Sequence, residues 1–336
     1  MKTPFLRCRS TMIQKSLNSV VAKLAASDKT SGDKFWAPRL SGQIPLSVLS
    51  LISQVTSSAS VRSAEEAATL LAAGFRSFIV TRPVVDAYSL RALSILARDS
   101  DVCVTIDHFR HAELLSQAMV AEGLTVSVLL DVDTGHSLTG VRPGPDSVRL
   151  AAAVTQLPGL QLGGVIVDES IFAKSLTLSD HGRILADAVA VAKHCQRMIE
   201  ASGLACRELA AGFDDFAASF TDPDVSRVLT SPFKTDGSVT PQSGLDKQRP
   251  ALSLVSQVIS RPSLEWCVID IGTGLIEQAF HTQVSHPAGV QLLKTHRDIS
   301  SLQLRGESLD LRIGDEIEFA LNAVPEGFHL PCVVED

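Results

Sequence analysis

The 336-residue sequence has no continuous apolar run of the roughly 18 residues that a membrane-spanning helix needs. It also has no excess of positive charge, because 30 Lys and Arg residues face 37 Asp and Glu residues and the formal net charge is −7. Nucleic acids and anionic membrane surfaces are bound through basic faces, so we expect neither as a partner. Residues 1–9 lack the apolar segment of a secretory signal, and we therefore expect a cytoplasmic protein.

Paired cysteine motifs are also missing. The six cysteines form no C-x-x-C pair and are scattered at Cys8, Cys103, Cys195, Cys206, Cys267 and Cys332. Several lie in apolar contexts, such as Cys103 between two valines. This pattern indicates reduced, buried thiols of the kind found in cytosolic proteins.

Short apolar segments alternate with segments of helical periodicity through the first two thirds of the chain. We expect strands at 35–39, 58–62, 78–81, 102–106, 124–130, 160–167, 204–210 and 227–230. Between two of them, Ser63 with Glu66 predicts the start of a helix and Gly74 its end. Uniformly apolar strands separated by helices indicate a parallel sheet covered on its outside. Eight such units predict a (β/α)8 barrel, and an open doubly wound sheet is the alternative.

The pattern changes after Pro232. Residues 234–249 are rich in Gly, Ser, Thr, Pro, Gln and Asp, which is typical of an exposed loop. Strand-like runs follow at 253–259, 266–271, 290–293 and 316–320, with turns between them that include Arg261-Pro262. We therefore expect a barrel over residues 20–235 and a mainly β domain built from residues 236–336 together with residues 1–19, whose strand joins it.

Several short motifs occur in an order that resembles one enzyme family. They are Thr3-Pro-Phe-Leu6, the Glu-Ala-rich helix that begins at Ser63 and ends at Gly74, Val80-Thr-Arg-Pro-Val-Val85, Leu130-Asp-Val-Asp-Thr-Gly135 with Gly140-Val141, Val268-Ile-Asp-Ile-Gly272 and Leu311-Arg-Ile-Gly-Asp315. Together they resemble the fold-type III pyridoxal-phosphate enzymes, in particular the D-threonine aldolase and D-serine dehydratase-like branch, with alanine racemase more distant. The resemblance implies the barrel and β-domain architecture and a homodimer in which both subunits line each site.

The positions that would hold pyridoxal phosphate in that family are changed here. The family places its cofactor lysine in a Pro-His-x-Lys-Thr-His-Lys segment, whereas this chain reads Pro38-Arg-Leu-Ser-Gly42, with Ser41 at or next to the lysine position. The arginine of the family's Asp-x-Gly-x-x-Arg segment is Leu138. An imine needs an amine nucleophile. We therefore expect no pyridoxal phosphate and no other cofactor-binding residue.

The family's phosphate loop and tyrosine are changed as well. Where the resemblance implies a Gly-Gly-x-Thr loop after the seventh strand, this chain reads Ala211-Gly-Phe-Asp-Asp215, and two carboxylates would repel a phosphate. The family's Gly-x-Tyr near the last strand is Pro232-Phe233.

A metal site remains as an alternative. The family ends in Pro-x-His-x-Cys or His-x-Asp, and this chain keeps His329 and Cys332 with two residues between them. A nearby Glu-His pair of the family reads Thr295-His296. His329 and Cys332 could together bind Zn²⁺. They could equally be structural residues, a histidine on the rim and a buried cysteine.

Ionisable residues follow most of the expected strands, at the end where barrel enzymes carry their sites. As catalytic candidates we take Asp107, His108, Asp133, His136 and Asp168. As substrate-binding candidates we take Arg39, Ser41, Arg82, Glu169, Asp214, Phe233 and His296. Asp107 with His108, and Asp133 with His136, are carboxylate–imidazole pairs suited to acid–base work. The alternative is that these residues have no catalytic role and only cap helices or lie in solvent on the rim of the barrel. His108 and His111 can in that case simply lie on the surface beside the helix that follows.

Three hypotheses follow for function. The first is a repurposed enzyme, a cofactor-independent lyase, cyclase or isomerase that acts on a small polar molecule by acid–base catalysis in the barrel mouth. The second is a noncatalytic pseudoenzyme or regulatory subunit of an active homologue. The third is a metal-dependent lyase that uses His329 and Cys332.

Overall fold

The chain divides into two compact units. The computed structural model describes residues 3–31, 35–41, 43–135, 139–168, 178–212, 222–233, 250–280, 285–321 and 330–335. Residues 19–42 and 49–231 form the larger unit, and residues 1–18, 43–48 and 232–336 form the smaller one. Among the described helices, none has both the length and the hydropathy that crossing a bilayer requires.

Eight parallel strands make the sheet of the larger unit, in the order β2-β9-β8-β7-β6-β5-β4-β3. Their bounds are β2 Phe35–Trp36, β3 Ser58–Val61, β4 Ser77–Val80, β5 Asp101–Ile106, β6 Val126–Asp131, β7 Leu160–Asp168, β8 Glu208–Gly212 and β9 Arg227–Leu229. A parallel bridge between Arg39 and Ser60 joins the two ends of the sheet. There the N–H of Leu40 donates to the Ser60 carbonyl at 3.0 Å, and the N–H of Ser60 donates to the Pro38 carbonyl at 2.8 Å. The sheet therefore nearly closes into the predicted barrel rather than remaining open.

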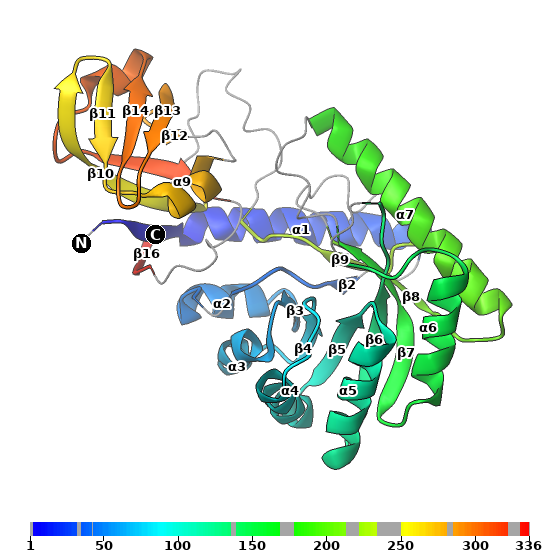
Figure 1. Ribbon diagram of the computed structural model, residues 1–336. Coiled ribbons are helices and arrows are strands. Elements are labelled where there is room, and N and C mark those ends of the chain that lie inside the picture. The colour runs from blue at the N-terminus through cyan, green and yellow to red at the C-terminus, as the bar shows by residue number, and fades with distance from the viewer. Residues whose placement is uncertain are drawn as a thin grey trace. The chain divides into compact units, whose positions relative to one another are not determined.

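Helices follow the strands around the outside, as Figure 1 shows for α3 to α6. The helices are α2 Leu46–Ser53, α3 Ala64–Ala72, α4 Ala87–Asp99, α5 Phe109–Ala121, α6 Pro145–Gln156 and α7 Leu178–Ala201. The predicted start of α3 is confirmed, because the Ser63 side chain accepts from the N–H of Glu66. The Glu66 carboxylate accepts from the N–H of Arg62, so this reciprocal bond falls one residue before the cap.

One apolar layer fills the middle of the barrel. It consists of Ala37, Ile79, Cys103, Leu129, Ile166, Ala210 and Leu229, all buried. Because side chains alternate along a strand, the residues two positions further on also face the interior, at the carboxyl end of the strands. The layer is buried and apolar, and barrel enzymes carry their sites beyond it, at the carboxyl end of the strands.

An ion pair lies at the other end of the barrel interior. Arg227 on β9 places its Nε 2.6 Å from Oε1 of Glu208 on the neighbouring strand β8. Burial raises the pKa of Glu208, and Arg227 partly opposes that shift. Burial also raises the pKa of the Cys103 thiol to about 12. Cys103 is therefore a protonated, buried thiol at neutral pH and not a nucleophile.

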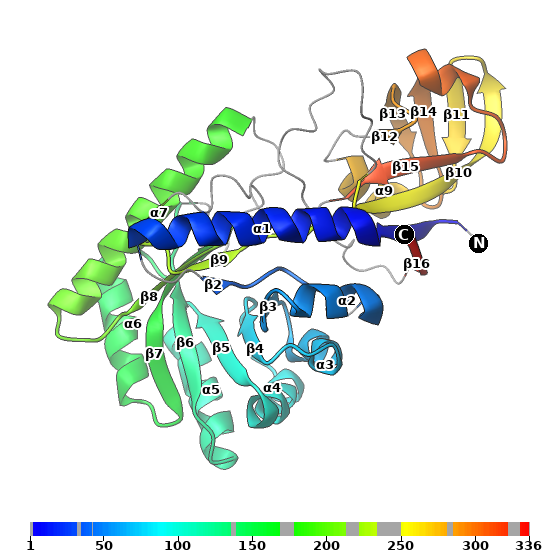
Figure 2. The ribbon, with the colours of Figure 1, turned by 180° about the vertical axis from the view of Figure 1, so that it is seen from behind.

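The smaller unit is built around an antiparallel sheet in the order β12-β15-β10-β11-β14-β13, seen from two sides in Figures 1 and 2. Its strands are β10 Leu252–Ser263, β11 Trp266–Ile269, β12 Ser285–His286, β13 Val290–Thr295, β14 Ser300–Leu304 and β15 Glu316–Ala320. Strand β1 (Phe5–Arg9) pairs antiparallel with β10 and parallel with β16 (Cys332–Glu335). Helix α1 (Ser10–Ser31) leads from β1 into the larger unit. Helix α9 (Thr273–Phe280) and the short helix η2 (Gly306–Asp310) complete this unit.

The turn predicted at Arg261-Pro262 is wrong. Strand β10 continues through both residues, and the chain reverses at Leu264 and Glu265. The register of β10 with β11 shifts around these positions, and a strand tolerates proline at such an irregularity because no ladder hydrogen bond is lost there. The Arg261 guanidinium donates to the carbonyls of Leu264, in the turn between β10 and β11, and of Leu309, in η2. These bonds connect the β10–β11 hairpin to η2.

Strand β1 is held by buried charge. The Arg9 guanidinium donates to both carboxylate oxygens of Glu318 on β15, at 2.9 and 2.7 Å, and the two side chains are 7% and 6% exposed. Arg7 contacts the same carboxylate and also Glu316, which is 45% exposed. Burial alone would raise the pKa of Glu318, but Arg9 and Arg7 hold it below its ordinary value of 4.5.

We expect Glu318→Gln to lower the free energy of unfolding by about 3 kcal/mol at pH 7, because it removes the nearest and most buried charge partner of the buried Arg9. The folded-state pKa of Glu318 is depressed, so this contribution is fully present above pH 4.5 and is lost as the pH falls through the folded-state value. Urea denaturation at several pH values measures it. The control is Glu316→Gln on the same strand, whose effect should stay below about 1 kcal/mol. Equal effects of the two variants would contradict the prediction.

Candidate active site at the barrel mouth

An arginine–aspartate pair bridges the carboxyl ends of strands β2 and β7. Arg39 follows β2, and its Nη1 and Nη2 donate to the two carboxylate oxygens of Asp168 at 2.8 and 2.6 Å. Asp168 is the last residue of β7, and β9 and β8 lie between β7 and β2 in the sheet. The side chains are 20% and 19% exposed. A bidentate pair of this kind is both strong and specific in geometry. It joins two sequence-predicted candidates that lie 129 residues apart.

Gly212 makes room for this ion pair. It ends β8, and a Cβ atom there would lie 2.2 Å from Nη2 of Arg39 and 2.8 Å from Cγ of Asp168. The side chains of Arg39 and Asp168 therefore cross directly over the backbone at the end of β8. This is the strand end after which the resembled family would carry its phosphate loop.

The described ends of the barrel strands offer no amine for an imine with pyridoxal phosphate. The chain has no lysine between Lys34 and Lys174, a span that includes strands β2 to β7. Within the described part of the larger unit, the lysine whose side chain is placed is Lys193 on α7. Its Nζ lies 2.7 Å from carboxylate oxygens of both Asp222 and Asp224. Burial lowers its pKa, but the two aspartates raise it above the ordinary value, so Lys193 is a cation rather than a nucleophile.

Asp107 pairs with His111 and not with His108, contrary to the pairing expected from the sequence. Asp107 follows β5, and its Oδ1 lies 2.8 Å from Nδ1 of His111 in the first turn of α5. Both side chains are largely covered, at 16% and 19% exposed. The two atoms are not aligned for a straight hydrogen bond. Such contacts in a site without substrate often tighten when substrate binds.

His108 is the N-cap of α5. Its Nδ1 accepts from the N–H of Arg110 at 3.0 Å, and the residue is exposed. The ring of His111 lies 6.0 Å away at an edge-on angle. The helix start thus uses one histidine as a cap and turns the other toward Asp107, because one helical turn brings positions four residues apart onto the same face.

The loop after β6 is tied to Asp107. The second carboxylate oxygen of Asp107 accepts from the N–H of Gly140 at 3.0 Å. Gly140 has a φ of +113°, and a Cβ there would lie 2.3 Å from the backbone nitrogen of Asp133, so a glycine is required. Val132 and Val141 form a parallel bridge at the same place. Asp133 itself accepts from the N–H of Gly135 at 2.8 Å, which is an Asx turn.

The remaining sequence-predicted site residues do not lie together in the part of the chain that the structure describes. Ser41 is half-buried after β2, and Arg82 is exposed after β4. Phe233 is buried, and it belongs to the smaller unit. His296 also belongs to that unit and lies exposed between β13 and β14, where its carbonyl accepts from Thr273. His136, Glu169, Asp214 and His329 lie outside the described residues.

The described residues contain no group of three or more His, Cys, Asp or Glu side chains arranged to hold a metal ion. Of the two metal candidates, Cys332 lies on β16, where its Sγ is 3.4 Å from Sγ of Cys8 on β1. The hydrogen bond from Cys8 lowers the pKa of Cys332, and that contact together with burial raises the pKa of Cys8.

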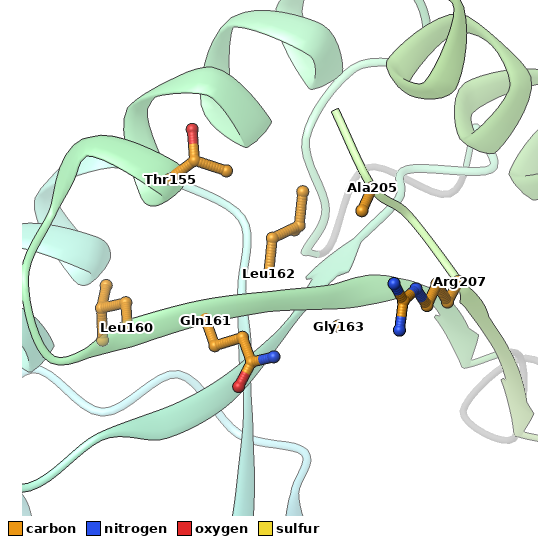
Figure 3. Close-up of a pocket in the computed structure, with 7 residues that line it drawn as sticks. All are labelled: Thr155, Leu160, Gln161, Leu162, Gly163, Ala205 and Arg207. Atoms are coloured by element: carbon orange, nitrogen blue, oxygen red, sulfur yellow. The ribbon is translucent and has the colours of Figure 1, made fainter. Parts of the chain in front are cut away.

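A recess of about 380 Å³ lies at the amino end of β7 (Figure 3). The Arg39–Asp168 pair lies at the carboxyl end of the same strand. The recess is lined by Thr155, Leu160, Gln161, Leu162, Gly163, Ala205 and Arg207. Arg207 is the one charged residue among them. In barrels this end serves stability and the carboxyl end carries the chemistry. The recess therefore does not compete with the mouth as a candidate site.

His111 is the residue that the sequence interpretation missed as a site candidate. The spacing of four residues from Asp107 across the start of a helix is the signal that could have found it. The adjacent Asp107-His108 pair was more conspicuous in the sequence, but neighbouring residues at a strand end point in different directions.

We expect Gly212→Ala to lower the free energy of unfolding by about 1–3 kcal/mol, because the new Cβ forces the Arg39–Asp168 pair to move. In an Arg39→Ala background the same substitution should cost clearly less, with a coupling energy above about 0.5 kcal/mol. Denaturant unfolding of the four chains of this cycle measures the coupling. Additive effects would show that Gly212 does not support the ion pair.

Comparisons with known proteins agree with this architecture. The family "Alanine racemase, N-terminal domain" matches residues 47–219, just over half of the chain. A D-threonine aldolase from Arthrobacter sp is 24% identical over 213 residues, which cover 62% of this chain and 56% of that relative. The matched part thus spans little more than half the length of that relative.

The matches to solved structures extend over both units. The crystal structure of D-threonine aldolase from Filomicrobium marinum has a TM-score of 0.78 and 21% identity, and the match covers 96% of this chain and 88% of that one. D-threo-3-hydroxyaspartate dehydratase from Delftia sp. HT23 has a TM-score of 0.74 and 18% identity, covering 96% and 90%. An alanine racemase from Clostridium difficile 630 has a TM-score of 0.63 and 15% identity, covering 98% and 88%. The fold, with a nearly closed barrel followed by an antiparallel β-domain, is shared, and the resemblance to fold-type III enzymes is confirmed. This chain belongs to the alanine racemase N-terminal domain family.

Proposed function

We propose that this chain is an enzyme that acts on a small polar molecule by acid–base catalysis at the barrel mouth, without a pyridoxal phosphate imine. The reaction classes that fit are those of a lyase, a cyclase or an isomerase, because each needs a proton removed at one atom and delivered at another. We further propose that it works in the cytoplasm as a homodimer.

The observation that carries the proposal is the Arg39–Asp168 pair over Gly212. The segment from Pro38 to Ser41 stands where the resembled family has its cofactor lysine. In this chain it supplies a guanidinium, which cannot lose its proton and form an imine. The guanidinium is also committed to Asp168 at 2.6 and 2.8 Å. A substrate carboxylate would find in Arg39 a partner that is already oriented and only one fifth exposed.

Proton transfer is proposed for His111. With Asp107 at its Nδ1, the imidazole would present Nε2 as the basic atom, and the carboxylate would stabilise the imidazolium that forms. Asp107 is itself fixed by the N–H of Gly140, so a change in the loop after β6 would shift the imidazole. Asp107 is thus a positioning residue, and His111 the proposed acid–base group.

We expect that incubation with pyridoxal phosphate, followed by borohydride reduction, leaves wild-type chain without a stoichiometric adduct at any one lysine. In Ser41→Lys, which returns an amine to the strand end, a single adduct at residue 41 should appear. Mass spectrometry of the digested protein reads both results. A stoichiometric adduct on any lysine of the wild-type chain would contradict the proposal.

A second experiment tests the acid–base group. The chain is incubated in deuterated water with D-threonine, D-serine, D-3-hydroxyaspartate and a set of 2-hydroxy acids, and exchange of the Cα hydrogen is followed by proton NMR. We expect exchange with at least one class, and a decrease of about a hundredfold or more in His111→Gln. His194→Gln is the matched control, an exposed histidine on α7. Equal exchange rates for wild type and His111→Gln would contradict the role of His111.

A noncatalytic role is the second candidate, and one specific observation favours it. His108, Asp133 and Asp107 each have a structural task, as a helix cap, an Asx turn and a loop anchor respectively. A barrel kept only as scaffold would retain those tasks. Absence of Cα exchange with every probe, together with unchanged binding to a catalytically active homologue in the His111→Gln variant, would support this candidate over the enzyme.

A further inference from the structure

Two cysteines from opposite ends of the chain meet in the smaller unit. Cys8 on β1 and Cys332 on β16 place their sulfur atoms 3.4 Å apart. The strands are parallel neighbours, with Leu6 opposite Cys332 and Cys8 opposite Val334. Cys8 and Cys332 are therefore diagonal neighbours on one face of the sheet, held there by backbone pairing rather than by a flexible loop.

The sulfur atoms are already in contact, but the strand backbones are too far apart for a disulfide. Because Cys8 and Cys332 are diagonal neighbours, their Cα atoms lie about 8 Å apart, beyond the usual span of a disulfide. The sulfur atoms would have to approach by about 1.4 Å, which requires side-chain rotation together with a small movement of β16, an edge strand, toward β1. The backbone of the strand pair would not need to change its register.

The two thiols differ in access. Cys8 is 1% exposed, whereas Cys332 is half-buried and the residues on both sides of it reach the surface. A small thiol reagent can thus reach Cys332 first and Cys8 only through Cys332. Such an order is what a two-step exchange between an attacking and a resolving thiol requires.

The remaining four cysteines differ from this pair. Cys103, Cys195, Cys206 and Cys267 are all buried. Burial raises the pKa of Cys103 and Cys206 to about 12 and that of Cys267 to about 11, so these thiols stay protonated and unreactive.

We propose that Cys8 and Cys332 form a reversible dithiol–disulfide site that fastens the C-terminal strand to the N-terminal strand. The oxidant is a low-molecular-weight disulfide of the glutathione class. The Cys332 thiolate attacks it, forms a mixed disulfide and releases one glutathione thiol. The Cys8 sulfur then attacks the Cys332 sulfur and releases the second. The two protein thiols lose two protons and two electrons, and one glutathione disulfide becomes two glutathione thiols.

Two consequences follow for this unit. Within the described residues, β16 pairs with β1 alone, so the bond would hold an edge strand whose other attachments are the ion pairs of Glu335 with Arg7 and Arg9. Oxidation would also remove Cys332 as a soft metal ligand, because a disulfide sulfur is not a thiolate. The metal alternative and the disulfide are therefore mutually exclusive states of one residue.

The test uses the full chain, reduced and then incubated in native buffer with graded ratios of reduced to oxidised glutathione. Free thiols are then blocked by alkylation in denaturant, which exposes the buried thiols to the reagent, and the digest is analysed by mass spectrometry. Chymotrypsin is the suitable protease, because trypsin would cut on both sides of Cys8. We expect a linked peptide containing Cys8 and Cys332, loss of alkylation at these two residues, and full alkylation at the other four. The yield should fall at least about tenfold in denaturing urea, where the fold no longer holds the thiols together.

Variants make the result specific. Cys8→Ser and Cys332→Ser should each abolish the linked peptide, whereas Cys267→Ser, which removes another buried thiol of the same unit, should keep it. Oxidised wild type should melt at a higher temperature than reduced wild type, and the two serine variants should show no such shift. Full alkylation of Cys8 and Cys332 at every glutathione ratio would overturn the proposal. So would a link found only between two chains, which mixing of isotope-labelled and unlabelled protein would reveal.

Discussion

The ion pair between Arg39 and Asp168 is the constraint on which the barrel mouth depends. The two charged groups lie 2.6 Å apart, although their residues follow two strands that are separated by two others in the sheet. The pair also needs Gly212, since any side chain at that position would occupy the same space. The segment that follows β2 thus supplies one side of a charge bridge. Any ligand at the mouth must meet that bridge.

The other polar groups of the rim show how closely structure and chemistry are joined. Asp107 anchors the loop after β6 through Gly140, and with its other oxygen it contacts the imidazole of His111. A carboxylate with two such partners keeps both the loop and the ring in place. The residues that stabilise the mouth are therefore the same residues that would orient an acid–base group. Their presence alone does not show whether the mouth is catalytic or only structural. Exchange of the substrate's Cα hydrogen distinguishes the two.

Much of the fold could be predicted from local patterns. The eight strands, the start of the helix after Ser63 and the change to a β-domain after Pro232 all follow from periodicity and turn residues. The prediction failed where local signals conflict with long-range pairing. Proline at position 262 indicated a turn, but pairing of β10 with β11 carries the strand through it. Strands β12, β14 and β16 were missed because segments of two to five residues have little periodicity of their own.

For the site, the sequence alone determined which chemical groups are present at the predicted strand ends: an arginine and a serine at the first, acidic residues at most others, and no lysine between Lys34 and Lys174. These are properties of residue type and strand position. Only the tertiary structure decided the partners. Arg39 meets Asp168, Asp107 meets His111 instead of His108, and Cys8 meets Cys332 across 324 positions of sequence. The Arg39–Asp168 and Cys8–Cys332 contacts are set by the closure of the barrel and the register of two strands, which local sequence does not encode. The Asp107–His111 contact has a local signal in its four-residue spacing, but two neighbouring histidines competed for it and the turn of the helix decided between them.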